Sequence, residues 1–262
     1  MQIKHIFQAS AVASALVLAG CGGDINISEG DIVTTTNTTT NNAPTTATPT
    51  TPTDTGLGEI SSFLSSQVSA ALGETVTVRT LSGRLIPDAA ARGEVTYTLT
   101  NDTVWALEGP VFIGNDNADT VTLEIEPGTI IFGRNGADYL VVSRGSEIVA
   151  TGTATQPIIM TSYNDVIGET VAPGQWGGLV LLGNAPSTKC PATGDCSLQV
   201  EGAAEGAVFG GTDEADSSGT LNYLVVKYAG FEVAPDNELN GITFGGVGSG
   251  TTVDYVQVHG NS

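Results

Sequence analysis

Short apolar runs separated by turn residues recur along most of this chain. Residues 121–162 contain four such runs, at 121–125, 130–132, 139–142 and 158–160. Pro-Gly, Asn-Gly, Arg-Gly and Gly-Thr steps lie between the runs. Strands typically have about 4–8 residues between such turn signals, and no i, i+3, i+4 helical stripe crosses this stretch. The pattern therefore predicts an all-β fold.

The residues before this stretch predict one helix and two strands. Residues 58–73 space their apolar side chains near the helical period, and Gly73 supplies a stop signal. We expect a short amphipathic helix there that caps the open end of the fold. Residues 74–85 and 94–99 alternate apolar and polar positions, which predicts strands.

An internal repeat indicates which kind of all-β fold this is. The run LNYLVV at 221–226 is echoed by VDYVQV at 253–258, and a Gly-Thr step precedes each copy. The run DYLVV at 138–142 is a third copy of the core of this repeat. Repeats with periods of about 20–45 residues are typical of solenoids, in which stacked coils bury a continuous column. The repeat favours a parallel β-helix over a β-sandwich with coincidental similarity.

The net charge limits the partners that we expect. Lys and Arg total 8 and Asp and Glu total 28, which gives a net charge of −20. Such an excess of negative charge repels nucleic acid and anionic lipid headgroups, so we expect no nucleic-acid partner. The simpler role of this charge is to keep the protein soluble.

The N-terminus carries the features of an export signal. The apolar run at 11–19 is too short to span a bilayer, and we expect residues 1–20 to be a signal peptide. The segment LAGC ending at Cys21 resembles the lipobox of bacterial lipoproteins, in which the Cys is lipidated and becomes the first mature residue. That resemblance, with Gly22 in place of Asp, implies anchoring in the outer membrane. An ordinary signal peptide is the alternative.

Residues 21–57 are predicted to be a disordered tether, because Thr and Pro dominate 34–55 and almost nothing there is apolar. Only two cysteines remain after Cys21, and they are Cys190 and Cys196. A close pair in an exported chain predicts a disulfide, whereas a metal site would need more ligands.

Several long motifs occur in one order over residues 103–262. They are TVWALEGPVFIGND, TVTLEIEPGTIIFGRNG, PGQWGGLVLLGNAP, FGGTDEADSSGTLNYLVVKYAG and NELNGITFGGVGSGTTVDYVQVHGNS. They resemble bacterial lipoproteins and secreted surface proteins expected to form right-handed parallel β-helices. The resemblance implies an architecture and a location, but no reaction. It also implies further coils after Ser262.

These observations divide the chain into four expected parts. They are a lipoprotein signal peptide at 1–20, a tether at 21–57, a short helix with N-terminal cap strands at 58–102, and a parallel β-helix at 103–262.

No catalytic group is evident from the sequence. His259 aligns with Lys227 in the repeat, so we expect it to be exposed just past a strand. A His-dependent triad needs a nearby Ser and an acid that orients the ring, and the chain contains no G-x-S-x-G elbow. We therefore predict no catalytic role for His259.

Two acidic loops are candidates for calcium binding. Asp213, Glu214 and Asp216 lie in one loop, and residues 115–119 form the other. Calcium takes six to eight oxygen ligands, and neither loop has the EF-hand register. Solvated turns are the simpler interpretation. If one loop binds calcium, the sequence favours Asp213, Glu214 and Asp216; we predict no other cofactor.

A polysaccharide lyase or hydrolase is the enzymatic alternative, by analogy of fold alone. A lyase needs a basic residue as proton acceptor, and the coils offer Arg134, Arg144, Lys189 and Lys227. Arg144 and Lys227 are the candidates among them, by default rather than from a motif. A glycosidase needs two facing carboxylates, and the sequence does not single out a pair.

Trp105 and Trp176 are either ligand platforms or packing residues, and their glycine-rich surroundings favour packing. Taken together, the sequence predicts a lipid-anchored outer-membrane protein, exposed at the cell surface. We expect it to be non-catalytic and to serve in adhesion or in binding a polysaccharide or an envelope protein. A carbohydrate-active enzyme and a structural spacer are the alternatives.

Overall fold

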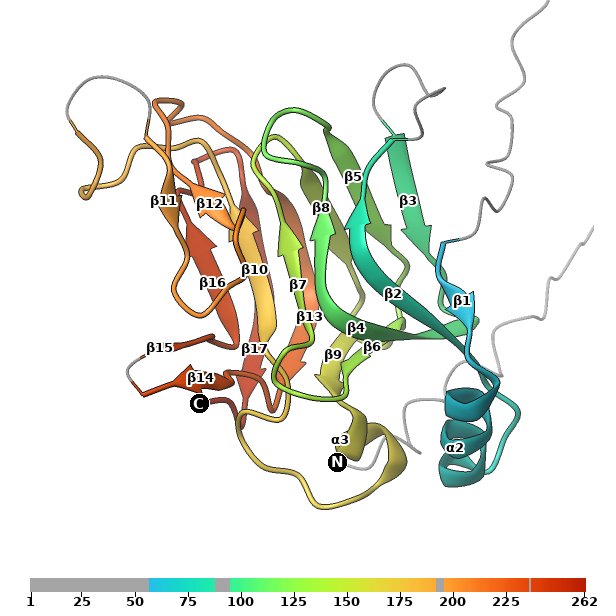
Figure 1. Cartoon of the computed structure of the whole chain (residues 1–262). Coiled ribbons are helices and arrows are strands. Elements are labelled where there is room, and N and C mark those ends of the chain that lie inside the picture. The colour runs from blue at the N-terminus through green and yellow to red at the C-terminus, as the bar shows by residue number, and fades with distance from the viewer. Residues whose placement is uncertain (1–56, 88–94, 192–195, 236) are drawn as a thin grey trace, which may run out of the picture.

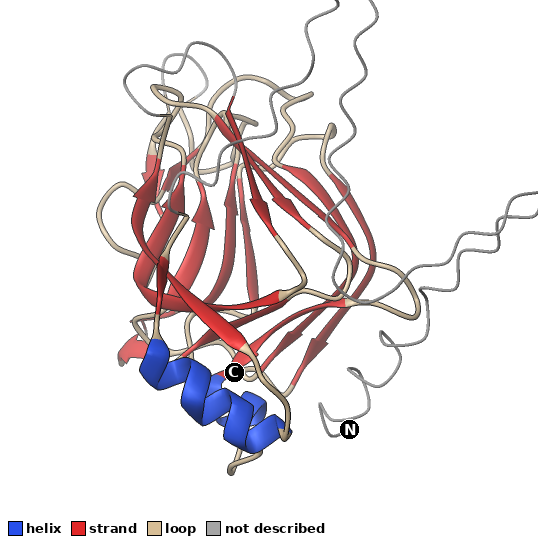
Figure 2. Cartoon of the chain, turned by 90° about the vertical axis from the view of Figure 1, so that its right-hand side faces the viewer, coloured by secondary structure: helices blue, strands red, loops and turns tan. Residues whose placement is uncertain are grey.

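The computed structural model describes residues 57–87, 95–191, 196–235 and 237–262. Within them, parallel strands wind around one interior, and successive coils stack from the N-terminal to the C-terminal side of the molecule (Figure 1). Figure 2 shows the strands as the walls of a prism, with both helices outside it. This arrangement confirms the predicted parallel β-helix.

The first wall, face A, is a stack of six strand segments. In spatial order they are β2 (Thr77–Leu85), the first half of β4 (Thr103–Ile113), β6 (Ile130–Gly133), β9 (Ile158–Ser162), and the second halves of β13 (Gly219–Lys227) and β17 (Thr252–His259). A short strand, β1 (Glu59–Ile60), pairs antiparallel with β2. The strands β2 and β3 (Val95–Leu99) belong to the parallel ladder itself, so the solenoid begins before the predicted start at Thr103.

The other two walls use separate strands and the remaining halves of the long ones. Face B contains the ends of β2 and β4, followed by β7 (Tyr139–Val142), β10 (Gly178–Leu182) and β16 (Ile242–Gly245). Face C contains β3, β5 (Val121–Ile125), β8 (Glu147–Thr151) and the first halves of β13 and β17.

The repeat found in the sequence is partly confirmed. The strands β13 and β17 pair in register, with Leu221 opposite Val253 and Val226 opposite Val258. The third copy at 138–142 is wrong, because its strand β7 lies on face B and Tyr139 is buried within it. The similar residues at 138–142 therefore belong to a different wall of the prism.

Inward side chains of all three walls form the main core. It includes Leu123, Ile131, Leu140, Leu181 and Leu224. Trp105 and Trp176 are 2% and 0% exposed, which confirms the packing interpretation for both.

The outer side of face A is covered in the first coils by two helices, α2 (Ser62–Leu72) and α3 (Tyr163–Ile167). Leu64 and Val68 of α2 pack on outward residues of this face, including Phe132. The predicted helix and its stop at Gly73 are confirmed, since Gly73 is the left-handed C-cap. Its predicted place at the open end is wrong, because its apolar side chains lie against the outside of the sheet.

The outer side of face B is covered by the segment that follows the disulfide loop. This segment includes the two-stranded pair β11 (Leu198–Gln199) and β12 (Val208–Phe209), and a second hairpin, β14 (Glu232–Ala234) with β15 (Asn237–Glu238), lies further along the chain. Val200, Ala207 and Leu239 pack on Tyr139 and Val180 of the face. Burial raises the pKa of Tyr139, whose hydroxyl oxygen accepts the N–H of Ala204 at 2.6 Å.

The last coil leaves apolar side chains exposed. Phe244, Val253 and Val258 are 46%, 48% and 54% exposed, and a hollow lies between β16 and β17. No helix in the described ranges is long and apolar enough to cross a bilayer. The predicted signal peptide, the lipidated Cys21 and nearly all of the tether lie outside these ranges, so they stay predictions.

The alternation of inward and outward residues can be tested on β5. Replacing Leu123, which is fully buried, with Ala should lower the free energy of unfolding by about 2–5 kcal/mol, because it opens a cavity in the column. The neighbouring Glu124→Ala should change it by no more than about 0.5 kcal/mol, since Glu124 points outward and is exposed. Urea unfolding measures both, and a larger effect for Glu124 would contradict the register.

Candidate functional site

Face C is the wall whose outer side stays uncovered among the described residues. Its outward side chains are half-buried or exposed, whereas those of the first coils of faces A and B are buried under the covering segments. We call these outward residues the open face: Thr96, Thr98, Thr122, Glu124, Glu147, Val149, Thr151, Thr220, Asn222, Thr252 and Asp254.

Strict alternation in the strands creates this surface. In β5, Val121, Leu123 and Ile125 are buried in the column, and Thr122 and Glu124 lie between them on the outside. The same alternation in β8 and β13 continues the pattern in the next coils. Because strands have a period of two, one sequence pattern yields both the core and the surface.

The outward residues line up in columns that cross the coils. One column runs Thr98, Glu124, Val149, Thr220 and Thr252 in register. Neighbouring strands lie about 4.8 Å apart, so the column presents a side chain at each such step along the solenoid. The described strand segments of face C contain no Lys or Arg, while Glu124, Glu147 and Asp254 give the open face a negative charge.

Two tyrosines form one edge of the open face. The rings of Tyr223 and Tyr255 are stacked, with centroids 4.5 Å apart and planes within 1°. Both residues have positive φ, 47° and 50°, at the corner where β13 and β17 pass from face C to face A. This conformation costs a residue with a Cβ about 1–2 kcal/mol, which a glycine at the same corner avoids.

A group of polar and titratable side chains lies on the outer side of face A, where this face meets α3. We call it the Lys227 cluster: Thr161, Asp165, Lys227, Tyr228 and His259. Lys227 Nζ forms an ion pair with Asp165 Oδ2, and Thr161 Oγ1 donates to the same oxygen at 2.8 Å. The paired side chains are 13% and 12% exposed. Lys227 must therefore break this ion pair before it can act as a base.

An aromatic pair, Tyr228 and His259, lies beside the lysine of this cluster. Lys227 Nζ lies 5.6 Å from the centre of the Tyr228 ring, which meets the His259 ring edge-on at 5.9 Å. Burial raises the pKa of the Tyr228 hydroxyl, and the Asp165 carboxylate raises it further. Lys227 and His259 are opposite each other in register and His259 is exposed, which confirms the predicted alignment. His259 is the last residue of β17 rather than just past the strand as predicted.

Arg144, the other predicted candidate for a lyase base, holds the structure together instead. Its Nε and Nη2 atoms contact the two carboxylate oxygens of Asp116 at 2.5 and 2.9 Å. Its Nη1 atom donates to the backbone oxygens of Cys196 and Gly210 at 2.9 and 2.6 Å. With only 9% of the residue exposed, the guanidinium has no free side for a substrate, so the structure overturns this candidate.

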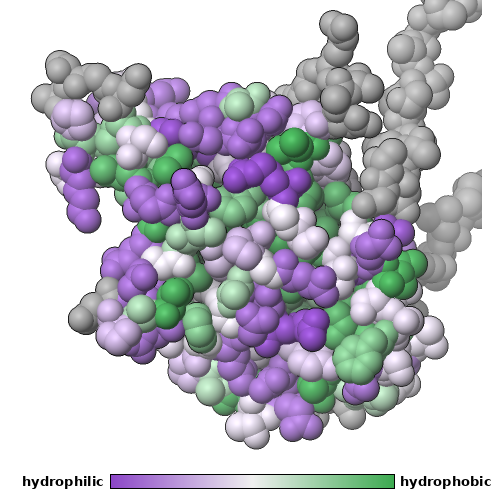
Figure 3. All heavy atoms as spheres, in the orientation of Figure 1, coloured by the Kyte–Doolittle hydropathy of each residue, from purple (hydrophilic) through white to green (hydrophobic). Residues whose placement is uncertain are grey.

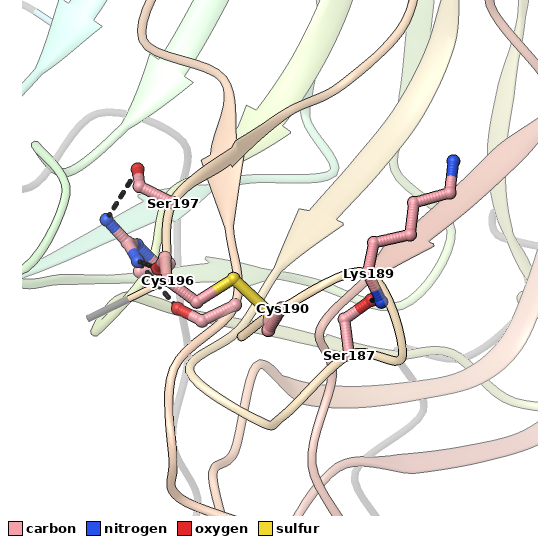
Figure 4. The surroundings of a disulfide bond; sticks show 7 residues. Ser187, Lys189, Cys190, Cys196 and Ser197 are labelled. Atoms are coloured by element: carbon pink, nitrogen blue, oxygen red, sulfur yellow. Dashed lines mark hydrogen bonds between the residues drawn. A yellow bond between two sulfur atoms is a disulfide. The ribbon is translucent and has the colours of Figure 1, made fainter. Parts of the chain in front are cut away.

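The disulfide predicted between Cys190 and Cys196 is present. Figure 4 shows it between Ser197 on one side and Ser187 and Lys189 on the other, with the Lys189 side chain pointing away. Lys189 is exposed. Arg134 is also largely exposed and contacts Glu108 at 3.6 Å.

The loop predicted for calcium does not gather its carboxylates. Asp216 points inward and accepts a hydrogen bond from Asn184 Nδ2 at 3.0 Å, while Asp213 Oδ1 accepts the N–H of Ala215. The described part of the chain contains no group of three or more His, Cys, Asp or Glu side chains placed to hold a metal ion. Calcium binding by Asp213, Glu214 and Asp216 stays a prediction.

The side of the molecule seen in Figure 3 is a mixture of hydrophilic and hydrophobic residues rather than one uniform patch. Sequence reasoning missed Asp165 because it lies in helix α3, 62 positions before its partner Lys227 on β13. It missed Tyr228, the next residue after Lys227, because the repeat gave that position no role. It found the tyrosine repeat at 223 and 255, but not that the two rings stack at the edge of an uncovered wall. The Asn-Tyr and Asp-Tyr steps were the available signal.

The structural role of Arg144 predicts a loss of stability on its removal. Arg144→Ala should lower the free energy of unfolding by about 1.5–3 kcal/mol, because it removes charge-assisted hydrogen bonds and leaves buried acceptors unpaired. Arg134→Ala is the matched control, and its exposed ion pair predicts a loss of less than about 1 kcal/mol. Equal losses of unfolding free energy for the two variants in urea unfolding would show that the Arg144 contacts stabilise the fold no more than an exposed ion pair does.

Comparisons with known proteins give one result that bears on the family. No curated protein and no solved structure matches the chain. The family model described as pectate-lyase like beta helix domain matches residues 92–262, which is more than half of the chain. The match begins close to β3 and spans the coils that carry the open face and the Lys227 cluster. The chain therefore belongs to the pectate-lyase-like β-helix domain family.

Proposed function

We propose that this protein is a non-catalytic surface lipoprotein that binds an extended ligand along the open face. The observation that carries the proposal is the contrast between the walls. Faces A and B bury their outward residues under helices and loops in the first coils, whereas no described segment covers the polar wall of face C across its five stacked strand segments. Solenoids commonly use such extended surfaces for binding.

The chemistry of the open face supports binding rather than catalysis. Proton abstraction from a substrate needs a base beside groups that stabilise the developing charge. The described strand segments of face C offer hydroxyls and carboxylates but no Lys, Arg or His. Glu124 and Glu147 lie on neighbouring strands but in different columns, and their carboxylates do not face each other across a cleft.

The location is part of the same proposal. The lipobox-like segment ending at Cys21 supports a lipid anchor, and the Thr-rich residues 34–55 support a tether between anchor and solenoid. An outer-membrane protein held in this way presents the open face to a polysaccharide or to an envelope protein. Mass spectrometry of the mature N-terminus tests the lipid on Cys21.

Bulky, positively charged side chains on the open face should weaken binding. Val149 and Thr220 are adjacent in register at its centre, so the double variant Val149→Arg, Thr220→Arg should weaken retention of envelope material at least about tenfold, or about 1.4 kcal/mol. Thr188→Arg, an exposed position in the disulfide loop, is the matched control. Pull-down of envelope polysaccharide and protein fractions by the full mature chain measures this. Undiminished retention by the double variant would place binding elsewhere.

A carbohydrate-active enzyme is the second candidate, favoured by the family match and by the Lys227 cluster. In such an enzyme Lys227, once released from Asp165 and free of its own extra proton, would take a proton from the sugar. The raised pKa of Tyr228 keeps its hydroxyl protonated, so Tyr228 would donate a proton to the leaving oxygen.

This candidate makes a prediction of its own. Lys227→Met and Tyr228→Phe should each reduce turnover of uronic-acid polymers at least about 100-fold, because each removes a proton-transfer group. The double variant Val149→Arg, Thr220→Arg, on a different wall, should leave turnover unchanged. Release of unsaturated or reducing ends is the measurement. If the wild-type protein shows no more turnover than Lys227→Met, the enzyme candidate is wrong.

A further inference from the structure

We propose that the open face is selective for a linear polysaccharide that carries free amino groups, with Tyr223 and Tyr255 contacting the ammonium-bearing sugars along one edge. This inference rests on the proposed function and names the ligand class for the same surface.

The first argument is charge. Glu124 and Asp254 are exposed and Glu147 is half-buried, and the described strand segments of this wall carry no compensating cation. The whole chain adds a field of the same sign, with a net charge of −20. Such a surface repels polymers of uronic acids and attracts ammonium groups. A neutral glycan gains nothing from this field.

The second argument is the aromatic edge. Asp254 precedes Tyr255, which is 63% exposed, and its Oδ1 atom accepts the N–H of Tyr255 at 3.0 Å. A carboxylate beside an exposed aromatic ring is a combination that recognises ammonium groups, through ion pairing and cation–π attraction together. The ring of Tyr223 stacks on that of Tyr255, which extends the aromatic edge over two coils.

The third argument is the backbone at the corner. Tyr223 and Tyr255 both adopt the left-handed conformation that glycine adopts without cost. A glycine would hold the same conformation at lower cost, so the backbone alone does not explain a tyrosine at both corners. The two rings stack on each other across the coils, and the Tyr255 side chain, which is 63% exposed, stays available for a further contact with a ligand.

The fourth argument is spacing. The column Thr98, Glu124, Val149, Thr220, Thr252 presents a side chain about every 4.8 Å along the solenoid. This step is close to the length of one pyranose residue in an extended chain. A linear glycan lying along the solenoid therefore meets a new coil at each sugar, and threonine hydroxyls and carboxylates can accept hydrogen bonds from it repeatedly.

The test compares three oligosaccharides of equal length on the full mature chain by isothermal titration calorimetry. They are a glucosamine hexamer, its fully N-acetylated form and a galacturonic acid hexamer. We expect the glucosamine hexamer to bind at least tenfold more tightly than the other two. Its affinity should fall as salt rises from 50 to 300 mM, because exposed charges are screened. Equal or tighter binding of either other oligomer overturns the inference.

Variants separate recognition from folding. Tyr255→Gly suits the positive φ and should leave the melting temperature unchanged or higher, yet weaken glucosamine binding about two- to fivefold. The double variant Glu124→Gln, Asp254→Asn should weaken it at least tenfold. Glu205→Gln removes an exposed carboxylate on the segment after the disulfide loop and serves as the matched control. Wild-type affinity in both open-face variants overturns the inference.

The two proposals fail differently. If the glucosamine hexamer does not bind but envelope material is still lost from the double variant Val149→Arg, Thr220→Arg, the ligand class is wrong and the proposed function stands. If that double variant retains envelope material as the wild type does, both are wrong.

Discussion

The whole structure depends on the fact that no coil can bury its own inward side chains. Leu123, Leu140 and Ile131 come from three different walls, and each becomes buried only when the coils before and after it are in place. The stability of the solenoid is therefore a property of neighbouring coils rather than of any single one. The same constraint explains the apolar side chains exposed on the last coil, where no further strand of the described chain lies against β17.

Stacking produces three walls, and the segments outside them decide which wall is available to a ligand. The helices α2 and α3 cover the start of face A, and the segment around Val200 and Ala207 covers face B. Their outward residues are apolar because they form secondary cores. Among the described residues, face C has no such cover, and most of its outward residues are threonines and carboxylates, the others being Val149 and Asn222. Face C is thus the wall whose outward residues are mostly polar and at least partly exposed, and this combination supports a binding role there.

The largely buried basic side chains of Arg144 and Lys227 are paired with carboxylates, although the chain as a whole carries an excess of negative charge. Arg144 connects the Asp116 loop, the disulfide and Gly210, and Lys227 is paired with Asp165. Both had been candidates for a catalytic base, and the structure gives each a carboxylate partner. Arg144 is enclosed, so among the basic candidates in the described ranges Lys227, beside Tyr228 and His259, is the one that keeps the enzyme candidate open.

The sequence by itself determined the period-two alternation of Val121, Leu123 and Ile125, the register of 221–226 on 253–258, the end of the helix at Gly73 and the disulfide. Each of these features depends on residues that are close together in the sequence or on the internal repeat, whose two copies pair in register. Only the tertiary structure decided that no described segment covers face C, that the 138–142 run belongs to another wall, and that Arg144 is held by its partners. Those outcomes depend on where segments fold back over the prism, and the contacts of Arg144 join residues 28 to 66 positions apart. Local pattern carries no information about partners at that separation, because packing between distant segments selects them.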